Sequence, residues 1–284
     1  MLTRTAPGGY LIVRTRPVHD NAVELEAQGF TAVRATFSAG EIRSLKEEIL
    51  SVYHDSEPDH RGGKGGTDVD NDFRYEMFNR SPLSQKIVAR REILDVIEPL
   101  IGEDCHIIAN TCWKNPPHDS LKHGGGGWHI DAGPHIPLTP DQKWPESIPH
   151  PVFAIGVHIF LEDCPLEAGP TGFIPGSHKS GLPPPAEERM NAELSYNGVK
   201  AKAIEAKAGD VVFFVSDVWH RRLPPKSTHR GRFFLQVHYG RRDIAQRVKP
   251  TTTINHIDEA AAERIDNDRE RLLLGLHRQG FYDG

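Results

Sequence analysis

The chain has 284 residues and a formal net charge of −5, with acidic and basic residues well mixed along it. This mixture argues against a nucleic-acid partner and against a polybasic membrane anchor. Hydrophobic residues make up 37% of the chain, which is enough for one large core.

The cysteines and the first residues bear on the compartment. Cys105, Cys112 and Cys164 are too few and too irregularly spaced for a disulfide framework, and none forms a Cys-x-x-Cys pair. Residues 1–10 lack the apolar run of a signal peptide, and no stretch is apolar enough for a transmembrane helix. We therefore expect a cytoplasmic protein with reduced thiols.

The N-terminal part, about residues 20–102, is predicted to be helical with a short extended segment at 31–34. Ser38 can cap a helix whose apolar residues recur on one face, and residues 82–101 read as a second helix. Between them, residues 54–72 are rich in Gly and Asp. We expect this stretch to be a loop, with its Gly-rich centre as a candidate lid.

From about residue 103 to residue 245 the pattern changes to short strands separated by Gly and Pro turns, which indicates an all-β sandwich or barrel. With helices mainly before it, we predict a mainly β fold with flanking helices: a double-stranded β-helix (jelly roll, cupin-like). The Pro-rich segment 134–151 is a second candidate lid, and about 257–284 a charged helical tail. The whole chain, 1–284, is expected to be one domain. The clearest predicted strands are 105–113, 128–132, 151–161, 199–206, 211–215 and 233–239.

The most informative motif is Trp128-His129-Ile130-Asp131. In a strand, residues i and i+2 point to the same face, so His129 and Asp131 can bind one metal ion. His220 follows a turn and a predicted strand that would bring it to the same place. Two histidines and one carboxylate form the facial triad of non-haem Fe(II) oxygenases, which leaves metal positions open for a co-substrate and O2. We expect these three residues to be the metal ligands.

A downstream arginine helps to choose between metals, because zinc hydrolases use the same ligand types. A 2-oxo diacid chelates iron through its 2-oxo-carboxylate end and needs a cation for its far carboxylate. Arg232, which opens a predicted strand, is our first candidate for that cation, and Arg230 is the alternate.

Several segments resemble the phytanoyl-CoA dioxygenase family of Fe(II)/2-oxoglutarate-dependent oxygenases. Residues 28–45 and 94–102 are similar to its N-terminal helix–strand–helix and to the segment before its barrel. Residues 128–131 match its first two ligands, and 160–179, with Ile174-Pro175-Gly176-Ser177-His178, resemble its most specific strip. The resemblance covers most of the chain. It implies a jelly roll, an Fe(II) cofactor, and 2-oxoglutarate and O2 as co-substrates.

Two departures from the family pattern concern the co-substrate pocket. Where members carry the anchoring arginine, this chain has Gly231, and Arg230 and Arg232 flank it. A one-residue insertion in the preceding Pro-rich loop would restore Arg232 to that role. His158 replaces a family tryptophan near the co-substrate, so it is either a pocket residue or an ordinary core histidine.

Weaker candidates complete the predicted site, and each could equally be structural. Thr171 and Arg74 are candidates for contacts with 2-oxoglutarate. A substrate mouth could be lined by aromatic and basic residues, namely Trp113, Lys114, His135 and Trp219.

The resemblance implies a dioxygenase that hydroxylates a small molecule and releases succinate and CO2. Halogenases of this general type replace the carboxylate ligand by a small residue, so Asp131 favours hydroxylation or a related desaturation, epimerisation or cyclisation. Two alternatives stay open: a Zn(II)-dependent hydrolase or isomerase, and a non-catalytic cupin-like binding protein. Because no basic cluster suits the phosphates of coenzyme A, we expect a small natural product or metabolite as the substrate. Oligomeric state is not predicted.

Overall fold

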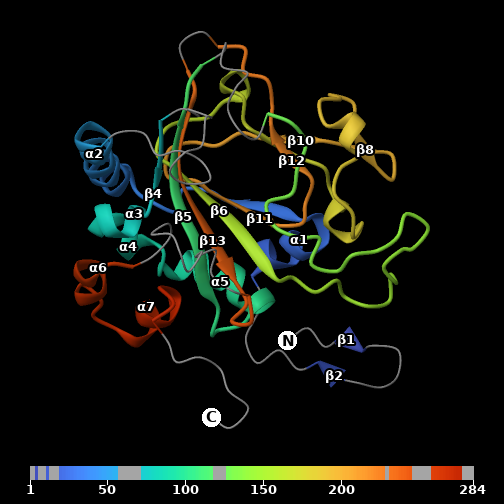
Figure 1. The fold of residues 1–284 in the computed structure, drawn as a ribbon, viewed down its shortest axis with the longest axis horizontal. Coiled ribbons are helices and arrows are strands. Elements are labelled where there is room, and N and C mark those ends of the chain that lie inside the picture. The colour runs from blue at the N-terminus through green and yellow to red at the C-terminus, as the bar shows by residue number, and fades with distance from the viewer. Residues whose placement is uncertain are drawn as a thin grey trace.

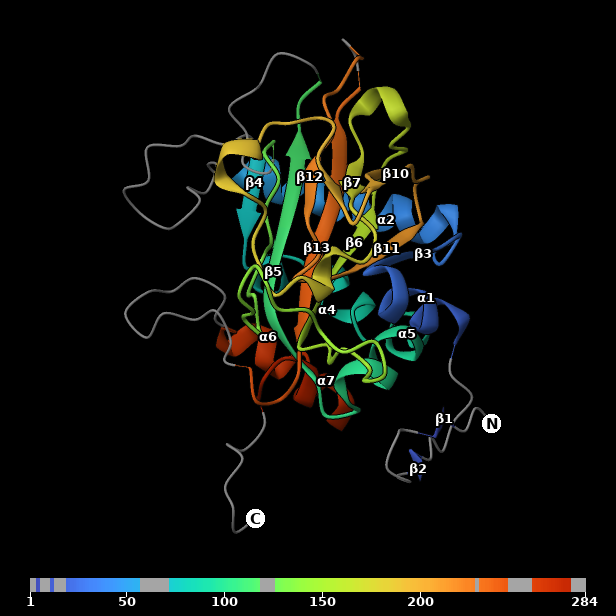
Figure 2. The same ribbon diagram turned by 90° about the vertical axis from the view of Figure 1, so that its right-hand side faces the viewer.

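The protein is built in layers. The computed structural model describes residues 19–56, 72–117, 126–227, 230–244 and 257–276, with the backbone alone of 4–5 and 11–12. In these ranges a large and a small antiparallel sheet face each other, and helices cover the outer side of the large sheet (Figure 1). Seen from the side, the small sheet lies in front of the upper part of the large one (Figure 2). This arrangement is the predicted jelly roll with flanking helices.

The helices of the described ranges lie mostly before and after the strands. They are α1 (Asp20–Gln28), α2 (Ala39–Asp55), α3 (Met77–Arg80), α4 (Pro82–Ile87), α5 (Arg91–Ile101), α6 (Glu259–Glu263) and α7 (Asp268–Leu273), with single 3₁₀ turns at Leu166–Ala168, Ser177–Lys179 and Ala186–Glu188.

The large sheet has the strand order β3-β11-β6-β13-β5-β4, and the small sheet has the order β10-β7-β12. Two short hairpins, β1–β2 and β8–β9, lie outside these sheets. The strands are β1 (Arg4–Thr5), β2 (Leu11–Ile12), β3 (Phe30–Val33), β4 (Asp72–Tyr75), β5 (His106–Asn115), β6 (Ala154–Phe160), β7 (Thr171–Phe173), β8 (Ser195–Tyr196), β9 (Val199–Lys200), β10 (Lys202–Ile204), β11 (Val211–Val215), β12 (His220–Arg222) and β13 (Arg232–Gly240).

The helix predicted after Ser38 is confirmed. The Ser38 hydroxyl accepts a hydrogen bond from the Glu41 backbone N–H (3.3 Å), and the Glu41 carboxylate accepts one from the Ser38 N–H (2.8 Å). This capping box satisfies N–H groups that have no partner inside the helix. The apolar stripe of α2, with Ile42 and Leu45, then packs against the large sheet.

The single helix predicted over 82–101 is wrong, because the chain forms two helices there. Pro82 begins α4, and the chain turns at 88–90 before α5 begins. The turn places the Arg90 guanidinium over the Phe37 ring (4.7 Å) and beside the Glu41 carboxylate of α2. Periodicity along one segment cannot reveal such contacts with another segment.

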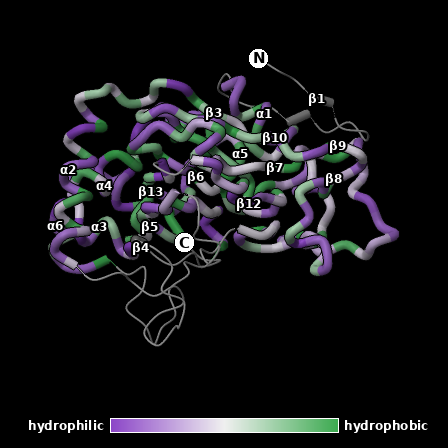
Figure 3. The backbone as a smooth tube through the Cα atoms, turned by 90° about the horizontal axis from the view of Figure 1, so that it is seen from above, coloured by the Kyte–Doolittle hydropathy of each residue, from purple (hydrophilic) through white to green (hydrophobic). Residues whose placement is uncertain are grey.

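Because side chains alternate along each strand, the large sheet has two faces, and both are buried. Apolar side chains such as Val157 and Leu235 point toward the helices and form the larger core. Their neighbours His158, Phe234 and Gln236 belong to the other face, which looks toward the small sheet. Figure 3 shows hydrophilic stretches mainly at the periphery and hydrophobic ones between them. Polar side chains are therefore unexpected on the inner face, which looks toward the small sheet, and those found there are candidates for function.

The strip 174–178 fastens the helical layer to the barrel. The Gly176 N–H donates to the Gln28 carbonyl (2.9 Å), and a ring nitrogen of His178 lies 3.1 Å from the Glu26 carbonyl oxygen. Gly29 ends α1 with φ 88°, and a Cβ there would lie 2.6 Å from Nδ1 of His178. Glycine is therefore required where the helix meets the strip.

The C-terminal segment 257–276 docks on the core, since Leu273 and Leu274 are buried in the larger cluster. Of the two predicted lids, the Gly-rich loop lies outside the described residues. The segment 134–151 contains no helix or strand and is joined to the barrel by the Leu138 N–H, which donates to the Gly181 carbonyl (3.1 Å). No helix in the described ranges is both long and apolar enough to cross a bilayer.

Candidate metal centre

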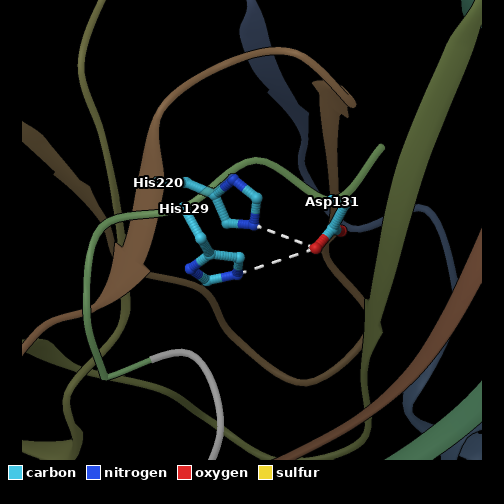
Figure 4. Close-up of side chains that lie close together, drawn as sticks. All are labelled: His129, Asp131 and His220. Carbon is cyan, nitrogen blue, oxygen red and sulfur yellow. Dashed lines mark ion pairs between the residues drawn. The ribbon is translucent and has the colours of Figure 1, made fainter. Parts of the chain in front are cut away.

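Three side chains predicted as metal ligands come together between the two sheets. Figure 4 shows the rings of His129 and His220 side by side, both directed at Asp131. Nε2 of each histidine lies 3.6 Å from Oδ1 of Asp131, and the three candidate donor atoms lie within 4.8 Å of one another. These residues could hold a single metal ion.

Backbone pairing explains how a distant histidine reaches this place. His129 and His220 form an isolated antiparallel bridge, with both N–H···O distances at 3.0 Å. The Asp131 N–H donates to the Ser216 carbonyl (3.0 Å), and His220 opens β12 of the small sheet. The strand predicted over 128–132 is wrong in extent, because only His129 pairs with another strand. The i, i+2 relation of the two ligands nevertheless holds.

Each histidine has one ring nitrogen hydrogen-bonded to a backbone carbonyl. Nδ1 of His129 lies 2.8 Å from the Gly127 carbonyl oxygen, and Nδ1 of His220 lies 2.9 Å from that of Val218. Because a carbonyl only accepts, Nδ1 is the donor in both rings, and Nε2, the nitrogen that faces Asp131, is the atom that can bind a metal.

The third candidate ligand is a carboxylate that stays ionised. Burial raises the pKa of Asp131, but the neighbouring His220 and His238 outweigh burial and hold that pKa well below its ordinary value. Asp131 therefore brings a negative charge into the interior at neutral pH. The set of two imidazoles and one carboxylate suits Fe(II), Mn(II), Co(II) or Zn(II).

Arg232 is a buried cation on the same inner face of the large sheet. Its Nε donates to Oδ1 of Asn115 (3.0 Å), and its Nη1 donates to the Thr171 hydroxyl (2.9 Å). Burial, with help from nearby Arg222, lowers the pKa of Arg232 to about 9. No carboxylate of the described residues forms an ion pair with it, although it is only 7% exposed. Such a cation is costly to bury unless an anion joins it.

Two further buried donors accompany Arg232. Nη1 of Arg222 and Nδ2 of Asn115 find no acceptor within the part of the chain that the structure describes. The two side chains are close neighbours, since Nη2 of Arg222 donates to the Pro116 carbonyl (2.8 Å). Two guanidinium groups and one amide NH2, none with a negative partner among the described residues, make this end of the barrel suitable for a carboxylate ligand.

His158 lies near both Arg232 and the triad. It projects from β6 on the inner face, opposite Gln236, with its ring 4.3 Å from that of Phe234. Burial, and next the positive charge of Arg232, hold the pKa of His158 well below its ordinary value, while Asp131 acts in the opposite direction. Its Nδ1 has no hydrogen-bond partner among the described residues. His158 is thus a neutral ring within electrostatic range of both Arg232 and Asp131.

Three predicted residues lie away from the triad. Arg230 is exposed and lines a surface pocket with Glu205. Arg74 and Lys114 lie on the face of the large sheet that looks toward the helices. Their cross-strand partners, Cys112 and Phe233, belong to the larger core on that face. Arg74 donates to the Tyr53 carbonyl (3.3 Å) and stacks on the Tyr53 ring.

The other three predicted substrate-mouth residues are buried or partly buried, namely Trp113, His135 and Trp219. Trp113 donates from Nε1 to Oε1 of Gln236 (2.7 Å), and Trp219 donates to the Leu182 carbonyl (2.8 Å). Nδ1 of His135 lies 2.6 Å from a carboxylate oxygen of Asp217, three residues before His220 in the chain.

Five inner residues near the site were not predicted: Asn115, Asp217, Arg222, Gln236 and His238. Alternation offered a signal for two of them. Positions 232, 236 and 238 share one face of the predicted strand 233–239, so polar residues there point into the same interior as Arg232.

Comparison with solved structures shows the same fold. HygX from Streptomyces hygroscopicus, with nickel and 2-oxoglutarate bound, aligns with a TM-score of 0.59 at 13% identity, over 80% of this chain and 88% of that one. The epimerase SnoN, in complex with Fe3+, alpha ketoglutarate and nogalamycin RO, gives 0.60 at 19%, over 88% and 96%. The carbocyclase SnoK of nogalamycin biosynthesis gives 0.57 at 19%, over 79% and 84%.

The sequence comparison is more specific. The family described as Phytanoyl-CoA dioxygenase (PhyH) matches residues 25–233, which include all three candidate ligands and Arg232. The match extends over most of the chain, from α1 through the first residues of β13. The protein therefore belongs to the phytanoyl-CoA dioxygenase family.

Proposed function

We propose that the protein is an Fe(II)- and 2-oxoglutarate-dependent dioxygenase that hydroxylates a small molecule and releases succinate and CO2. Bound iron supplies the activation of O2, and 2-oxoglutarate supplies electrons as it loses CO2. His129, Asp131 and His220 would hold the metal, and Arg232 with Thr171 would hold the distal carboxylate of the co-substrate.

The observation that carries the proposal is the buried, unpaired charge of Arg232 on the inner face that also carries the triad's neighbours. A hydrolase that uses a metal and water has no need of such a cation. A dicarboxylate with a 2-oxo end needs both a metal with open positions and a distant positive group. Nη1 of Arg222 and Nδ2 of Asn115, which lack an acceptor among the described residues, would donate hydrogen bonds to the same carboxylate.

The surroundings favour a water-poor reaction site. Aromatic rings of Phe214 and Phe173 pack against His220, at 4.9 and 5.8 Å between ring centroids. His158 stays neutral and adds no charge between Arg232 and the metal ligands. Exclusion of water strengthens the electrostatic grip on the co-substrate and limits side reactions.

The fold neighbours support the cofactor assignment and a small-molecule substrate. HygX has been crystallised with nickel, 2-oxoglutarate and hygromycin B, and SnoN with Fe3+, alpha ketoglutarate and nogalamycin RO. We propose a natural product or metabolite of comparable kind for this chain. Asp131 keeps the carboxylate ligand in place, which favours hydroxylation, or a related desaturation, epimerisation or cyclisation, over halogenation.

Binding of 2-oxoglutarate to metal-loaded protein tests the proposal without knowledge of the substrate. Isothermal titration calorimetry would be run on the nickel-loaded wild type, on Arg232→Gln, and on Arg230→Gln as the control at the alternate position. Loss of one charge-assisted contact should raise Kd at least about tenfold in Arg232→Gln. Arg230→Gln should bind as the wild type does.

A second ligand tests whether the arginine reads the distal carboxylate. 2-Oxovalerate keeps the chelating end but lacks that carboxylate, so it should bind weakly and with equal affinity to the wild type and to Arg232→Gln. Metal-loaded wild type that binds neither acid would overturn the proposal and favour a zinc hydrolase or a non-catalytic binding protein.

A further inference from the structure

The second oxygen of the Asp131 carboxylate is held by two side chains of β13. Nε2 of His238 lies 2.8 Å from Oδ2 of Asp131, and Nε2 of Gln236 donates to the same oxygen over 3.4 Å. Oδ1, in contrast, is the oxygen that faces Nε2 of both His129 and His220. The two oxygens of one carboxylate therefore have separate partners.

We propose that His238 and Gln236 are positioning residues that keep Asp131 a one-oxygen ligand of the metal. The geometry gives Oδ2 two hydrogen-bond donors and leaves Oδ1 for the ion. The inference rests on the proposed function in one respect only, namely that 2-oxoglutarate and O2 take the metal positions that a one-oxygen Asp131 leaves open.

His238 is a donor here and not a fourth ligand. An ionised carboxylate only accepts hydrogen bonds, so the ring nitrogen at 2.8 Å carries a proton and has no lone pair for a metal. The ring is buried at 4% exposure, and the Phe214 ring stands against it, 6.0 Å away and nearly perpendicular. His238 thus has one available role at this site, which is to hold Oδ2.

Gln236 is oriented by partners of its own. Its Oε1 accepts hydrogen bonds from Nε1 of Trp113 (2.7 Å) and from the Thr111 hydroxyl (3.4 Å). An indole N–H can only donate, so the amide oxygen must face Trp113 and the amide NH2 must face Asp131. The indole is fixed in turn against the Phe73 ring (4.3 Å).

Such restraint has a consequence for the metal. A carboxylate free to rotate can bind through both oxygens and occupy one more position on the ion. The co-substrate chelate and O2 would need the metal positions that the three protein ligands leave open. Groups that orient a metal ligand typically change metal affinity about 10–100-fold when they are removed.

Cobalt(II) provides the test, because its visible absorption reports the number and geometry of its ligands and needs no co-substrate. Cobalt would be titrated into metal-free wild type, His238→Leu, His238→Gln and Gln236→Leu. His106→Leu is the control, since His106 is also a buried histidine of the large sheet, and its Nε2 is hydrogen-bonded to the Ile244 carbonyl (2.7 Å).

In His238→Leu we expect the cobalt Kd to rise about 10–100-fold and the absorption spectrum to change. His238→Gln, whose amide can still donate to Oδ2, should recover most of the affinity and the wild-type spectrum. Gln236→Leu should weaken cobalt binding less, and His106→Leu should leave Kd and spectrum unchanged even if it lowers Tm.

A purely structural role for His238 predicts another pattern. His238→Leu and His106→Leu would then lower Tm alike, with the cobalt Kd and spectrum of the wild type, and that result would overturn the inference. Equal loss in His238→Gln and His238→Leu would also overturn it. Wild type that binds cobalt tightly but not 2-oxoglutarate would count against the proposed function alone.

Discussion

Two buried arginines define the chemistry of this protein at the level of single residues. Arg222 donates to the carbonyls of Ala168, Gly169 and Pro116, yet its Nη1 has no acceptor among the described residues. Its burial lowers the pKa of Arg222 to about 10. Beside Arg232 it places a second positive charge in the interior, which an anionic ligand would stabilise.

Replacement of Arg222 should therefore weaken the response to 2-oxoglutarate. In Arg222→Met we expect the rise in Tm on adding 2-oxoglutarate to metal-loaded protein to be at most about half that of the wild type, because stabilisation follows ligand affinity. Arg221→Met is the control, since Arg221 lies over the Trp128 ring and donates to the Met190 carbonyl. An equal ligand-induced shift in the wild type and Arg222→Met would refute a role for Arg222 in binding.

At the level of elements, one position on the inner face of the large sheet leaves no room for a side chain. Gly156 of β6 pairs with His238, and a Cβ on it would lie 2.2 Å from the Phe214 ring. That ring packs against His220. A methyl group at this position would push an aromatic side chain into a metal ligand.

We expect Gly156→Ala to lower the free energy of unfolding by about 1–3 kcal/mol and to weaken metal binding as well. The same substitution at Gly40, in the first turn of α2, meets no atom closer than the Ser38 hydroxyl at 4.0 Å. Gly40→Ala should stabilise the protein by up to about 1 kcal/mol, because alanine favours helix. Urea unfolding measures both, and changes of the same sign would contradict this account of the sheet.

The elements also show what the sequence can and cannot predict. The ligand motif at 129–131 depends on local geometry, so it was found from the sequence even though its strand shrinks to a single bridge. The partners of Arg232 and Asp131 come from strands β5, β7 and β13, whose pairing no local pattern reveals. The helix predicted over 82–101 lacks the break at 88–90 for the same reason, because Arg90 forms an ion pair with Glu41 of α2.

For the whole molecule, the helical layer and the barrel are joined where α1 meets the strip 174–178. His178 sits at this junction, almost fully buried beside His150 (5.7 Å between rings). Burial lowers the pKa of His178 from 6.5 to about 3, with a smaller contribution from Lys179. The folded protein therefore keeps this ring neutral in weakly acidic solution.

The junction makes stability depend on pH. Between pH 6.5 and about 3 the unfolded chain binds a proton at His178 that the folded chain does not, so stability is present above pH 6.5 and lost as the pH falls. The loss from this group should reach about 2 kcal/mol between pH 7 and pH 5. Urea unfolding of metal-free wild type and His178→Gln should show a smaller pH effect in the variant. The exposed His54→Gln should match the wild type, and equal pH effects in all three proteins would refute this role.

The central claim is that the triad and Arg232 together bind iron and 2-oxoglutarate. The most direct measurement is an anaerobic titration of Fe(II)-loaded protein with 2-oxoglutarate, followed by the weak visible metal-to-ligand charge-transfer band. We predict a saturable band in the wild type, its loss in His129→Ala, and saturation only at higher 2-oxoglutarate concentration in Arg232→Gln. A folded, iron-replete wild type with no band would contradict the account.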